Sequence, residues 1–436
     1  MGQAHAVPLT LHCRNCGQII DGSGRVAFAN VRSETSPLTA AFAQALEKPP
    51  SPAAAAAAPL CDFEVFDTIE AARGPWLELA AQAAMTPYQC PDFLGAWQDS
   101  VGAGLGVTPM IVLARDEFGR PSALFPFCRA RSGPWRVGMF LGGRNANYNL
   151  ALIRRDARID PAALAGFLRR AGRSQSCRVD AFALKNQPLA WYGARNPLAR
   201  PSDLASSSVG YRTQLRGGYD KWLGERHSGE SRKKLRKKAG ALAAMGALRH
   251  CVAMDAAQAA EIIGALRAHK LSQLRALGAD GALRELPRAE FLALAAAKCD
   301  GADGARLEFH ALKCGERIVA TFAGLAFRGG LYGLFISYDQ DKALARCSPG
   351  VLLVNAIVAS LFDRGYSCLD LGAGGARYKE DACEVVEPLF DRAIAVSVSG
   401  RLWAVAFGAQ QRLKRRVKRS PRAMAVAARL AALLRR

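Results

Sequence analysis

The sequence lacks a hydrophobic segment long enough to cross a membrane. A spanning helix needs roughly 20 apolar residues in succession, and even the apolar stretch from Ala423 to Leu434 is interrupted by Arg429. The first residues, MGQAHAVPLTLHCRN, also lack the basic segment and uninterrupted apolar core of a secretory signal. These two absences predict a protein that does not cross a membrane and stays in the cytoplasm.

Closely spaced cysteines are also scarce. Twelve cysteines are scattered over 436 residues, unlike the tight framework of a disulfide-rich secreted domain. Cys13 and Cys16, with His5 and His12 near them, offer zinc ligands, but a structural zinc site normally combines two such pairs. We therefore expect a reduced protein without a metal, and the role of Cys13 and Cys16 stays open.

Acidic residues are missing from the C-terminal end. Ten of the residues from Arg412 to Arg436 are Arg or Lys and none is acidic; without these ten, the net charge of +22 falls to +12. This balance favours anionic partners such as coenzyme phosphates, nucleic acid or an acidic membrane surface. Apolar residues such as Val417 and Leu430 alternate with the arginines. Residues 412–436 are therefore predicted to lie on an anionic membrane as an amphipathic helix, or to form a loosely attached basic tail.

Length and periodicity divide the chain into four parts. A chain of 436 residues exceeds what one hydrophobic core usually serves. Residues 1–59 lack sustained periodicity and end in a Pro- and Ala-rich stretch, which predicts a disordered leader or linker. Residues 60–205 and 206–400 are predicted to be two domains, joined by a Pro- and Ser-rich link at 197–208. Residues 401–436 form the basic tail.

The two central parts repeat one plan. In the first, strands are predicted over 107–115, 122–128 and 135–141, followed by a helix near 161–171 and a strand near 178–184. In the second, helices precede a similar order of elements; the predicted helices are 231–245, 259–276, 288–298 and 349–364, and the strands are 307–313, 318–327, 331–337, 367–371 and 393–398. A meander, a crossover helix and a short buried strand thus occur twice, which indicates a duplicated α/β unit.

The segment from Arg346 to Leu352 (RCSPGVL) is the first candidate binding site. Ser348 is a good N-cap and Pro349 suits the first turn, so a helix is expected to begin here with unpaired backbone amides. Gly350 lets a ligand approach the backbone closely, and Arg346 adds positive charge. Such a helix start suits a phosphate or pyrophosphate. An ordinary well-capped crossover helix explains the same residues equally well.

A second candidate site is the segment from Asp370 to Lys379 (DLGAGGARYK). A carboxylate ends a buried strand, a glycine-rich bend containing Gly372 follows, and Tyr378 and Lys379 come next. Ligands bind at strand ends in open α/β sheets, so this concentration of polar groups favours a functional role for Asp370 and Lys379. The glycines are explained at least as well by a turn that needs positive φ.

Taken together, these residues resemble a known family. The run RCSPGVLLVNAIVASLFDRGYSCLDLGAGGARYKED, preceded by the basic helix SRKKLRKKAGAL, resembles the acetyltransferase domain of CelD-type cellulose-biosynthesis proteins. That group belongs to the GNAT superfamily and is similar to the Fem-type aminoacyl ligases, which also carry two GNAT-like domains. The resemblance covers about residues 215–395, and 61–201 matches only as a degenerate first copy. It implies an α/β fold of tandem GNAT-like domains, each a mixed, mostly antiparallel twisted sheet flanked by helices.

The resemblance also implies roles for these residues. In the superfamily, the gap between two splayed strands holds the pantetheine arm of the donor, and the helix after the fourth strand holds the pyrophosphate. The segment starting at Arg346 departs from the usual Gln/Arg-x-x-Gly-x-Gly/Ala loop, and no dedicated general base stands out. The candidate catalytic residues are Asp370, Tyr378 and Lys379. The candidate donor-binding residues are Arg346, Ser348, Gly350, Val351 and Leu352, and the candidate acceptor-binding residues are Gly372, Arg236 and Lys237.

The expected function is acyl transfer from acyl-CoA to an amine or hydroxyl of a sugar, polysaccharide precursor or similar acceptor. Two alternatives stay open. The basicity of the chain also suits a ligase that takes its donor from charged tRNA. The basic helix and tail also suit a non-catalytic polyanion-binding protein, although no interleaved aromatic residues are present to stack on bases. The sequence leaves the acceptor, the acyl chain and the oligomeric state undetermined.

Overall fold

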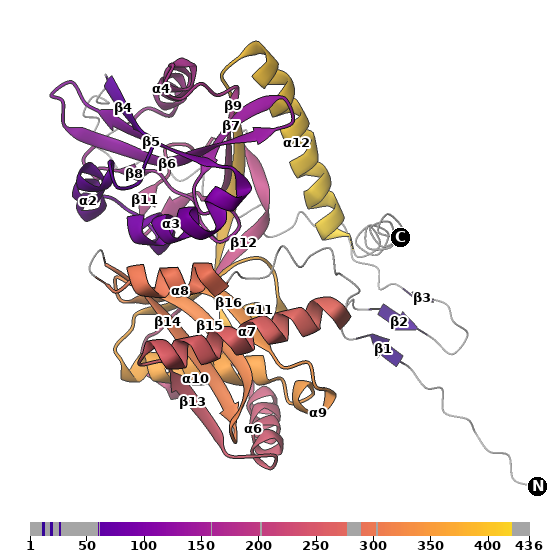
Figure 1. Cartoon of the computed structure of the whole chain (residues 1–436). Coiled ribbons are helices and arrows are strands. Elements are labelled where there is room, and N and C mark those ends of the chain that lie inside the picture. The colour runs from indigo at the N-terminus through magenta and orange to yellow at the C-terminus, as the bar shows by residue number, and fades with distance from the viewer. Residues whose placement is uncertain are drawn as a thin grey trace, which may run out of the picture.

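One long sheet organises the molecule. The computed structural model describes residues 11–13, 18–20, 26–27, 60, 62–157, 159–200, 203–276, 289–301 and 304–420. Within these ranges, 13 strands form a single continuous sheet. Figure 1 shows the first half of the chain above the second, each with helices beside its strands. The predicted fold class, a mixed and mostly antiparallel twisted sheet flanked by helices, is confirmed.

The first half of the chain forms one end of the sheet. Its elements are β4 (Asp62–Phe66), α2 (Arg73–Gln82), α3 (Pro91–Trp97), β5 (Thr108–Arg115), β6 (Pro121–Ser132), β7 (Trp135–Phe140), β8 (Leu152–Ile153), α4 (Pro161–Arg173) and β9 (Ala181–Pro188). Strands β5, β6 and β7 form the predicted antiparallel meander. After helix α4, strand β9 returns parallel to β7. Helix α4 begins as the sequence predicts, since the Asp160 carboxylate accepts from the amide of Ala163 at 2.6 Å.

The second half repeats this order at the other end. It contains α5 (Tyr219–Arg226), α6 (Gly229–Ala243), β13 (Leu248–Val252), α7 (Ala256–Ala276), α8 (Ala289–Lys298), β14 (Ala305–Cys314), β15 (Arg317–Phe327), β16 (Gly330–Tyr338), α9 (Lys342–Ala345), α10 (Pro349–Asp363), β17 (Cys368–Ala373) and α11 (Arg377–Ala382). Strands β14, β15 and β16 form the second meander, and β17 returns parallel to β16 after α10. The predicted repetition of meander, crossover helix and parallel strand therefore occurs in the structure.

Strand β15 shows why the second meander is so apolar. Every residue of β15 after Arg317 is buried, because both faces of the strand are covered. On one face Ala323 and Leu325 belong to a core that includes residues of α7 and α8, and on the other face Phe322 packs into a core that includes residues of α10. A strand covered on both faces reads as a continuous hydrophobic run rather than an alternating one.

The two halves also exchange strands. Strand β12 (Leu204–Gln214), which follows the first half in the sequence, pairs with β17 of the second half. Strand β18 (Val385–Ala395), which follows the second half, pairs with β9 of the first half. Strands β12 and β18 pair with each other between them. Each half therefore completes the sheet of the other, and the boundary predicted at residues 205/206 falls inside β12.

Two predictions fail in this exchanged region. Residues 204–208 were predicted to be part of a polar link, but they begin β12. Leu204 and Ala205 pair with β18, and the pairing resumes at Val209 after an irregularity in which the Ser206 hydroxyl donates to Asn186. The strand predicted over 393–398 begins much earlier, at Val385. Its polar residues hid the pattern, since Glu387, Asp391 and Arg392 are polar yet largely buried.

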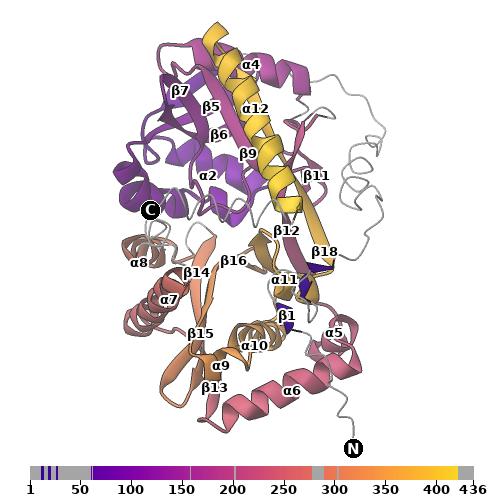
Figure 2. The ribbon, with the colours of Figure 1, turned by 90° about the vertical axis from the view of Figure 1, so that its right-hand side faces the viewer.

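The C-terminal part described is one helix, α12 (Val398–Arg419). Figure 2 shows it crossing the strands of the sheet diagonally, and its Trp403 and Phe407 turn inward. Residues 421–436, the rest of the predicted basic tail, lie outside the described residues, as does Cys16. Three short strands, β1 (Leu11–Cys13), β2 (Gln18–Ile20) and β3 (Val26–Ala27), form a separate small sheet. No helix in the described ranges combines the length and hydropathy needed to cross a membrane.

The docking of α12 can be tested at Gly400. A Cβ at this position would overlap the carbonyl oxygen of Asp180, which accepts from the amides of Val396 and Ser397 and therefore cannot move aside. We expect Gly400→Ala to lower the free energy of unfolding, measured by urea denaturation, by about 1–3 kcal/mol. The matched control is Gly264→Ala on the exposed face of α7, where a Cβ meets no atom within 4 Å. That control should stabilise by up to about 1 kcal/mol, and equal effects of the two changes would contradict the packing described here.

Candidate active site

The two predicted binding segments, 346–352 and 370–379, both adjoin strands β16 and β17. Strands β16 and β17 pair in parallel from Gly330 with Cys368 as far as Tyr332 with Asp370, and their pairing ends there. Asp370 is therefore the last paired residue before the strands diverge. Helix α10, which connects the two strands, begins beyond the far end of β16 at Tyr338. The six residue-to-residue steps from Tyr332 to Tyr338 place the two segments roughly 20 Å apart.

Asp370 is buried at the junction of the two halves. Its side chain is enclosed, with the residue only 1% exposed. The carboxylate accepts from the amide of Gly372 at 2.7 Å and from the hydroxyl of Tyr148, in the first half, at 2.9 Å. Burial raises the pKa of Asp370 to about 6, against the lowering effect of these donors and of the cations Arg212 and Lys379. Tyr148 reaches the carboxylate because Gly210 of β12 has no side chain to block its ring.

Asn147 fills the point where β16 and β17 separate. Its side-chain amide donates to the carbonyl of Gly333 at 2.8 Å and accepts from the amide of Ala373 at 3.1 Å. It thus bridges the two strands as a backbone peptide would. Tyr88 donates to the same Gly333 carbonyl at 2.9 Å. The innermost part of the gap is consequently occupied by side chains from the first half.

Arg212 and Glu387 form a second charged pair next to Asp370. The guanidinium of Arg212 lies over the rings of Trp191 and Tyr192, at 5.2 and 5.1 Å from their centroids. Its Nη2 is 3.5 Å from Glu387 Oε2. Burial raises the pKa of Glu387 to about 7; Arg212 lowers it and Asp370 raises it further. The Glu387 side chain is 13% exposed. Of the two carboxyl groups, Asp370 and Glu387, solvent therefore reaches Glu387.

Lys379 and Tyr378 lie on α11, just after the glycine-rich bend. The Lys379 amine donates to the carbonyls of Gly372 at 3.3 Å and Ala373 at 3.2 Å. Burial lowers the pKa of Lys379 to about 8, although the Asp370 carboxylate opposes this shift. Tyr378 packs against the core that includes α10, and burial raises the pKa of its hydroxyl. Gly372 has a φ of 76°, the left-handed region that glycine favours, so the bend delivers its carbonyl to Lys379.

The start of α10 differs from the prediction in one respect. Ser348 does not cap the helix: it adopts a left-handed conformation with φ 54°, because the chain turns sharply there from the end of α9. Its hydroxyl instead accepts from the Lys238 amine of α6 at 2.8 Å. The carbonyl of Ser348 accepts from the amides of Val351 and Leu352. Fewer amides are free than the sequence suggested.

One backbone donor is still available at this end. The amide of Gly350 has no acceptor among the described residues, and Arg346 is exposed beside it in the chain. The contact of Lys238 with Ser348 brings the cationic helix α6 to this corner. Arg236 and Lys237 are exposed on α6. We refer to Lys238, Arg346, Ser348 and Gly350 as the donor corner. Leu352 is buried in the core and contributes packing.

Several residues of the site were missed from the sequence. Tyr88, Asn147 and Tyr148 lie in the first half of the chain, and Arg212 and Glu387 lie on the exchanged strands. Little in the local sequence marks them, because their partners are as far as 222 residues away. The one available signal was the polar run at residues 145–149 (NANYN) between apolar segments. In the described ranges, no group of three His, Cys, Asp or Glu side chains is arranged to hold a metal ion.

The second half also matches a known family. Residues 229–380 match the model described as the acetyltransferase (GNAT) domain. This region therefore resembles a GNAT domain. Its match spans the donor corner, the divergence of β16 and β17, and Asp370. Both predicted segments lie within the matched residues.

Solved structures resemble more of the chain than the GNAT domain alone. The crystal structure of FemX is 9% identical, with a TM-score of 0.51, covering 79% of this chain and 99% of FemX. L-PGS from Bacillus licheniformis is 15% identical, with a TM-score of 0.44, covering 76% of this chain and 94% of its own. A tandem GNAT protein from the clavulanic acid biosynthesis pathway is 11% identical, with a TM-score of 0.41, covering 77% and 99%. No curated protein gives a significant match. At these identities, the likeness to FemX establishes the fold alone.

Proposed function

We propose that the protein is an acyltransferase that moves an acyl group from acyl-CoA to an amine or hydroxyl. The observation that carries this proposal is the position of the donor corner. Its cations and free amide lie at one end of the gap between β16 and β17, and the buried charged groups around Asp370 lie at the other end. A donor with an anionic head and a long thin arm suits that spacing of roughly 20 Å.

The donor corner supplies attraction for the anionic head. The Gly350 amide and the dipole of α10 favour a diphosphate at the helix start, and Lys238 and Arg346 add positive charge. The exposed Arg236 and Lys237 of α6 extend this field toward solvent. The pantetheine arm would then follow the gap inward as far as Asn147, whose hydrogen bonds to both strands set the inner limit.

At the inner end, Glu387 is our proposed general base. The attacking amine or hydroxyl must lose a proton as its new bond to the acyl carbon forms and the thioester C–S bond breaks. A partly accessible carboxyl with a pKa of about 7 is suited to accept that proton near neutral pH. The released thiolate of CoA takes up a proton from solvent. Arg212 holds the Glu387 carboxylate in place through their contact at 3.5 Å.

Asp370, Lys379 and Tyr378 have a supporting role in this proposal. Asp370 is enclosed and already accepts from Tyr148 and Gly372, so we assign it to positioning rather than proton transfer. Lys379 fixes the carbonyls of Gly372 and Ala373 and thereby shapes the wall where the acceptor would bind. Tyr378 packs beneath this bend. These assignments make Asp370 and Lys379 positioning residues of the site rather than proton-transfer groups.

A sugar or polysaccharide precursor is the acceptor class that we propose, on the resemblance to CelD-type proteins described above. The scattered cysteines support a cytoplasmic enzyme. The basic segment 412–436 would place it at the anionic inner face of the membrane.

A second candidate is a ligase that takes its acyl group from aminoacyl-tRNA. The specific observation in its favour is the cationic helix α6, which reaches the donor corner through Lys238 and carries five exposed basic residues: Arg232, Lys233, Lys234, Arg236 and Lys237. Such a helix suits a nucleic-acid backbone as well as the phosphates of CoA. The two candidate functions are distinguished by measuring whether acetyl-CoA or aminoacyl-tRNA supports product formation.

The donor site is tested by calorimetry with acetyl-CoA. We expect Gly350→Glu to weaken binding about tenfold or more, because the new carboxylate occupies the diphosphate position. The control is Gly264→Glu on the exposed face of α7, which should bind as the wild type does. A melting temperature close to that of the wild type shows that the variant is folded, and Lys238→Gln provides a milder second change. Wild-type affinity in both Gly350→Glu and Lys238→Gln would exclude this donor site, and binding of aminoacyl-tRNA instead of acetyl-CoA would favour the ligase.

The general base is tested by the pH dependence of turnover. Because burial raises the pKa of Glu387, its basic form appears above pH 7, and kcat/KM of the wild type should rise with pH through about 7. Glu387→Gln should lower kcat by about 10²- to 10⁴-fold and remove this rise. Glu316→Gln, at a carboxylate that is 90% exposed, is the control. A variant at Glu387 that keeps the wild-type pH profile would rule out this role.

A further inference from the structure

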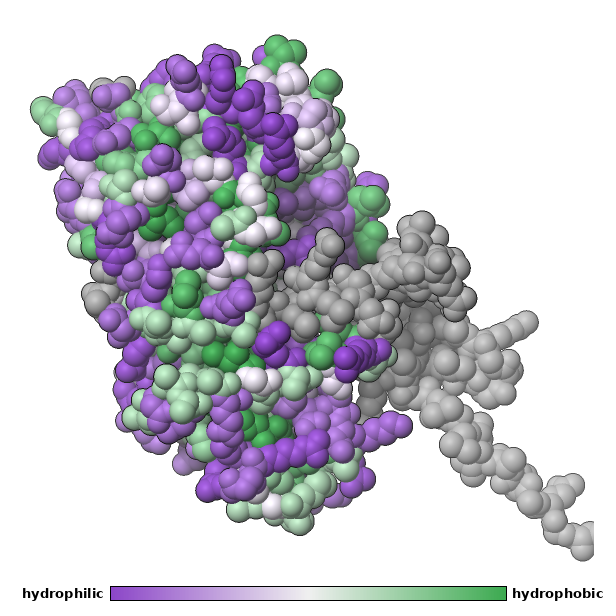
Figure 3. All heavy atoms as spheres, in the orientation of Figure 1, coloured by the Kyte–Doolittle hydropathy of each residue, from purple (hydrophilic) through white to green (hydrophobic). Residues whose placement is uncertain are grey.

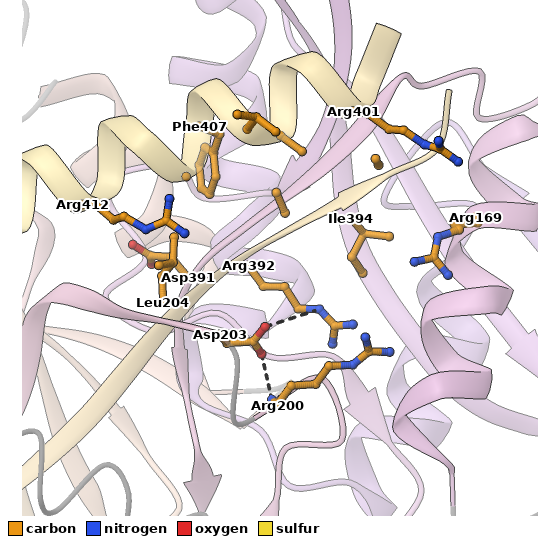
Figure 4. A pocket seen from close by; sticks show the side chains of 15 residues that line it. Arg169, Arg200, Asp203, Leu204, Asp391, Arg392, Ile394, Arg401, Phe407 and Arg412 are labelled. Carbon is orange, nitrogen blue, oxygen red and sulfur yellow. Dashed lines mark hydrogen bonds and ion pairs between the residues drawn. The ribbon is translucent and has the colours of Figure 1, made fainter. Parts of the chain in front are cut away.

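A second cationic site lies away from the GNAT gap, between α4, β18 and α12. It is a cleft of about 500 Å³, shown in Figure 4. Five arginines from four parts of the chain line it: Arg169, Arg200, Arg392, Arg401 and Arg412. On β12 its residue Leu204 is eight residues from Arg212, which is roughly 26 Å along the strand. The cleft is therefore separate from the proposed acyltransferase site.

The two acids of this cleft do not balance its five cations. Asp203 accepts from the amide of Arg200 at 2.8 Å and lies 3.7 Å from Arg392. Asp391 is buried, with the residue 3% exposed, and its carboxylate accepts from the backbone amide of Asn186 at 2.8 Å. For Arg169, Arg401 and Arg412, no acidic partner lies within salt-bridge distance in the described part of the chain. Three guanidinium groups are thus left for a ligand.

The arginines also crowd one another. In Figure 4 the guanidinium groups of Arg200 and Arg392 turn toward Arg169 on α4. Burial lowers the pKa of Arg392, and the neighbouring cations Arg200 and Arg169 lower it further. Like charges held this close repel one another unless an anion lies between them. Arginine, with its planar fork of donors, is the side chain that matches phosphate oxygens in a bidentate manner.

We propose that this arginine cleft binds a phosphate group, as a phosphate monoester or a diphosphate. The floor of the cleft is apolar, formed by residues such as Ile394 and Phe407. An apolar portion of the ligand can therefore lie against it while the phosphate contacts the arginines. Neither the donor corner nor Glu387 takes part, so the proposal holds whether or not the chain is an acyltransferase.

The ligand can come from a lipid or from solution. Helix α12, which contributes Arg401 and Arg412, carries four exposed apolar residues along its outer side: Val398, Leu402, Val405 and Leu413, between 63% and 79% exposed. Hydrophobic side chains are visible along that edge of the molecule in Figure 3. Val405 also lines the cleft, so an apolar surface adjoins the arginines. A phospholipid headgroup and a soluble phosphate therefore both need to be tested.

The test compares two probes: sodium pyrophosphate by calorimetry, and phosphatidylcholine vesicles with and without phosphatidic acid by flotation. All proteins carry Gly350→Glu, so that the donor corner contributes no binding. The cleft variant combines Arg169→Gln and Arg401→Gln. The control combines Arg155→Gln and Arg267→Gln, which removes the same charge from exposed arginines elsewhere.

The expected result is that the cleft variant loses binding about tenfold or more while the control keeps it. Loss for pyrophosphate indicates a soluble phosphate ligand, and loss only for phosphatidic acid vesicles indicates a lipid headgroup. The proposal is overturned if neither probe binds the parent protein, or if the control loses as much binding as the cleft variant. That second outcome would show a general effect of net charge. In a separate measurement, Arg169→Gln and Arg401→Gln are combined in a protein that keeps Gly350. Binding of acetyl-CoA by this protein shows that the donor corner is intact, so loss of the cleft ligand is distinguished from failure of the acyltransferase proposal.

Discussion

The exchange of strands β12 and β18 is the constraint on which the rest of the structure depends. Neither half of the chain has a complete sheet by itself, because β12 satisfies the backbone of β17 in the second half and β18 satisfies that of β9 in the first. Buried backbone groups must find partners, so each half needs the other in order to fold. The shared core, in which Phe93 of α3 contacts Phe291 of α8, adds apolar burial across the same boundary.

The exchanged strands also carry buried charged residues of the site. Arg212 and Glu387 are carried on the two exchanged strands, and Asp370 lies on the strand next to β12. Tyr148 of the first half donates to the Asp370 carboxylate, and Asn147 joins the backbones of β16 and β17 beside it. The result is a cluster of ionisable groups whose pKa values are displaced toward neutrality: Asp370, Glu387 and Lys379. Such clusters gather at functional sites. The donor corner, by contrast, is built entirely from residues of the second half.

The features that the sequence predicted correctly depend on interactions between residues close together in the chain. The meanders, the crossover helices and the start of α4 at Asp160 depend on periodicity and caps within a few residues. The segments around Gly350 and Asp370 were found for the same reason. The sequence could not predict Tyr148, Arg212 or Glu387 as site residues, because their roles depend on contacts between distant strands. Strand β18 was missed at its start because buried polar residues interrupt the apolar pattern, and Ser348 was assigned as a cap because its left-handed conformation comes from the preceding turn.

The central claim, that the two halves share one buried site, is tested most directly by a double-mutant cycle across it. The free energy of unfolding is measured at about pH 8, above the pKa of about 6 of Asp370, for Tyr148→Phe, Asp370→Ala and the double variant. If the hydroxyl of Tyr148 stabilises the buried carboxylate as described, the two changes will be coupled by about 1–3 kcal/mol. Additive effects, within about 0.5 kcal/mol, would contradict a shared site between the halves.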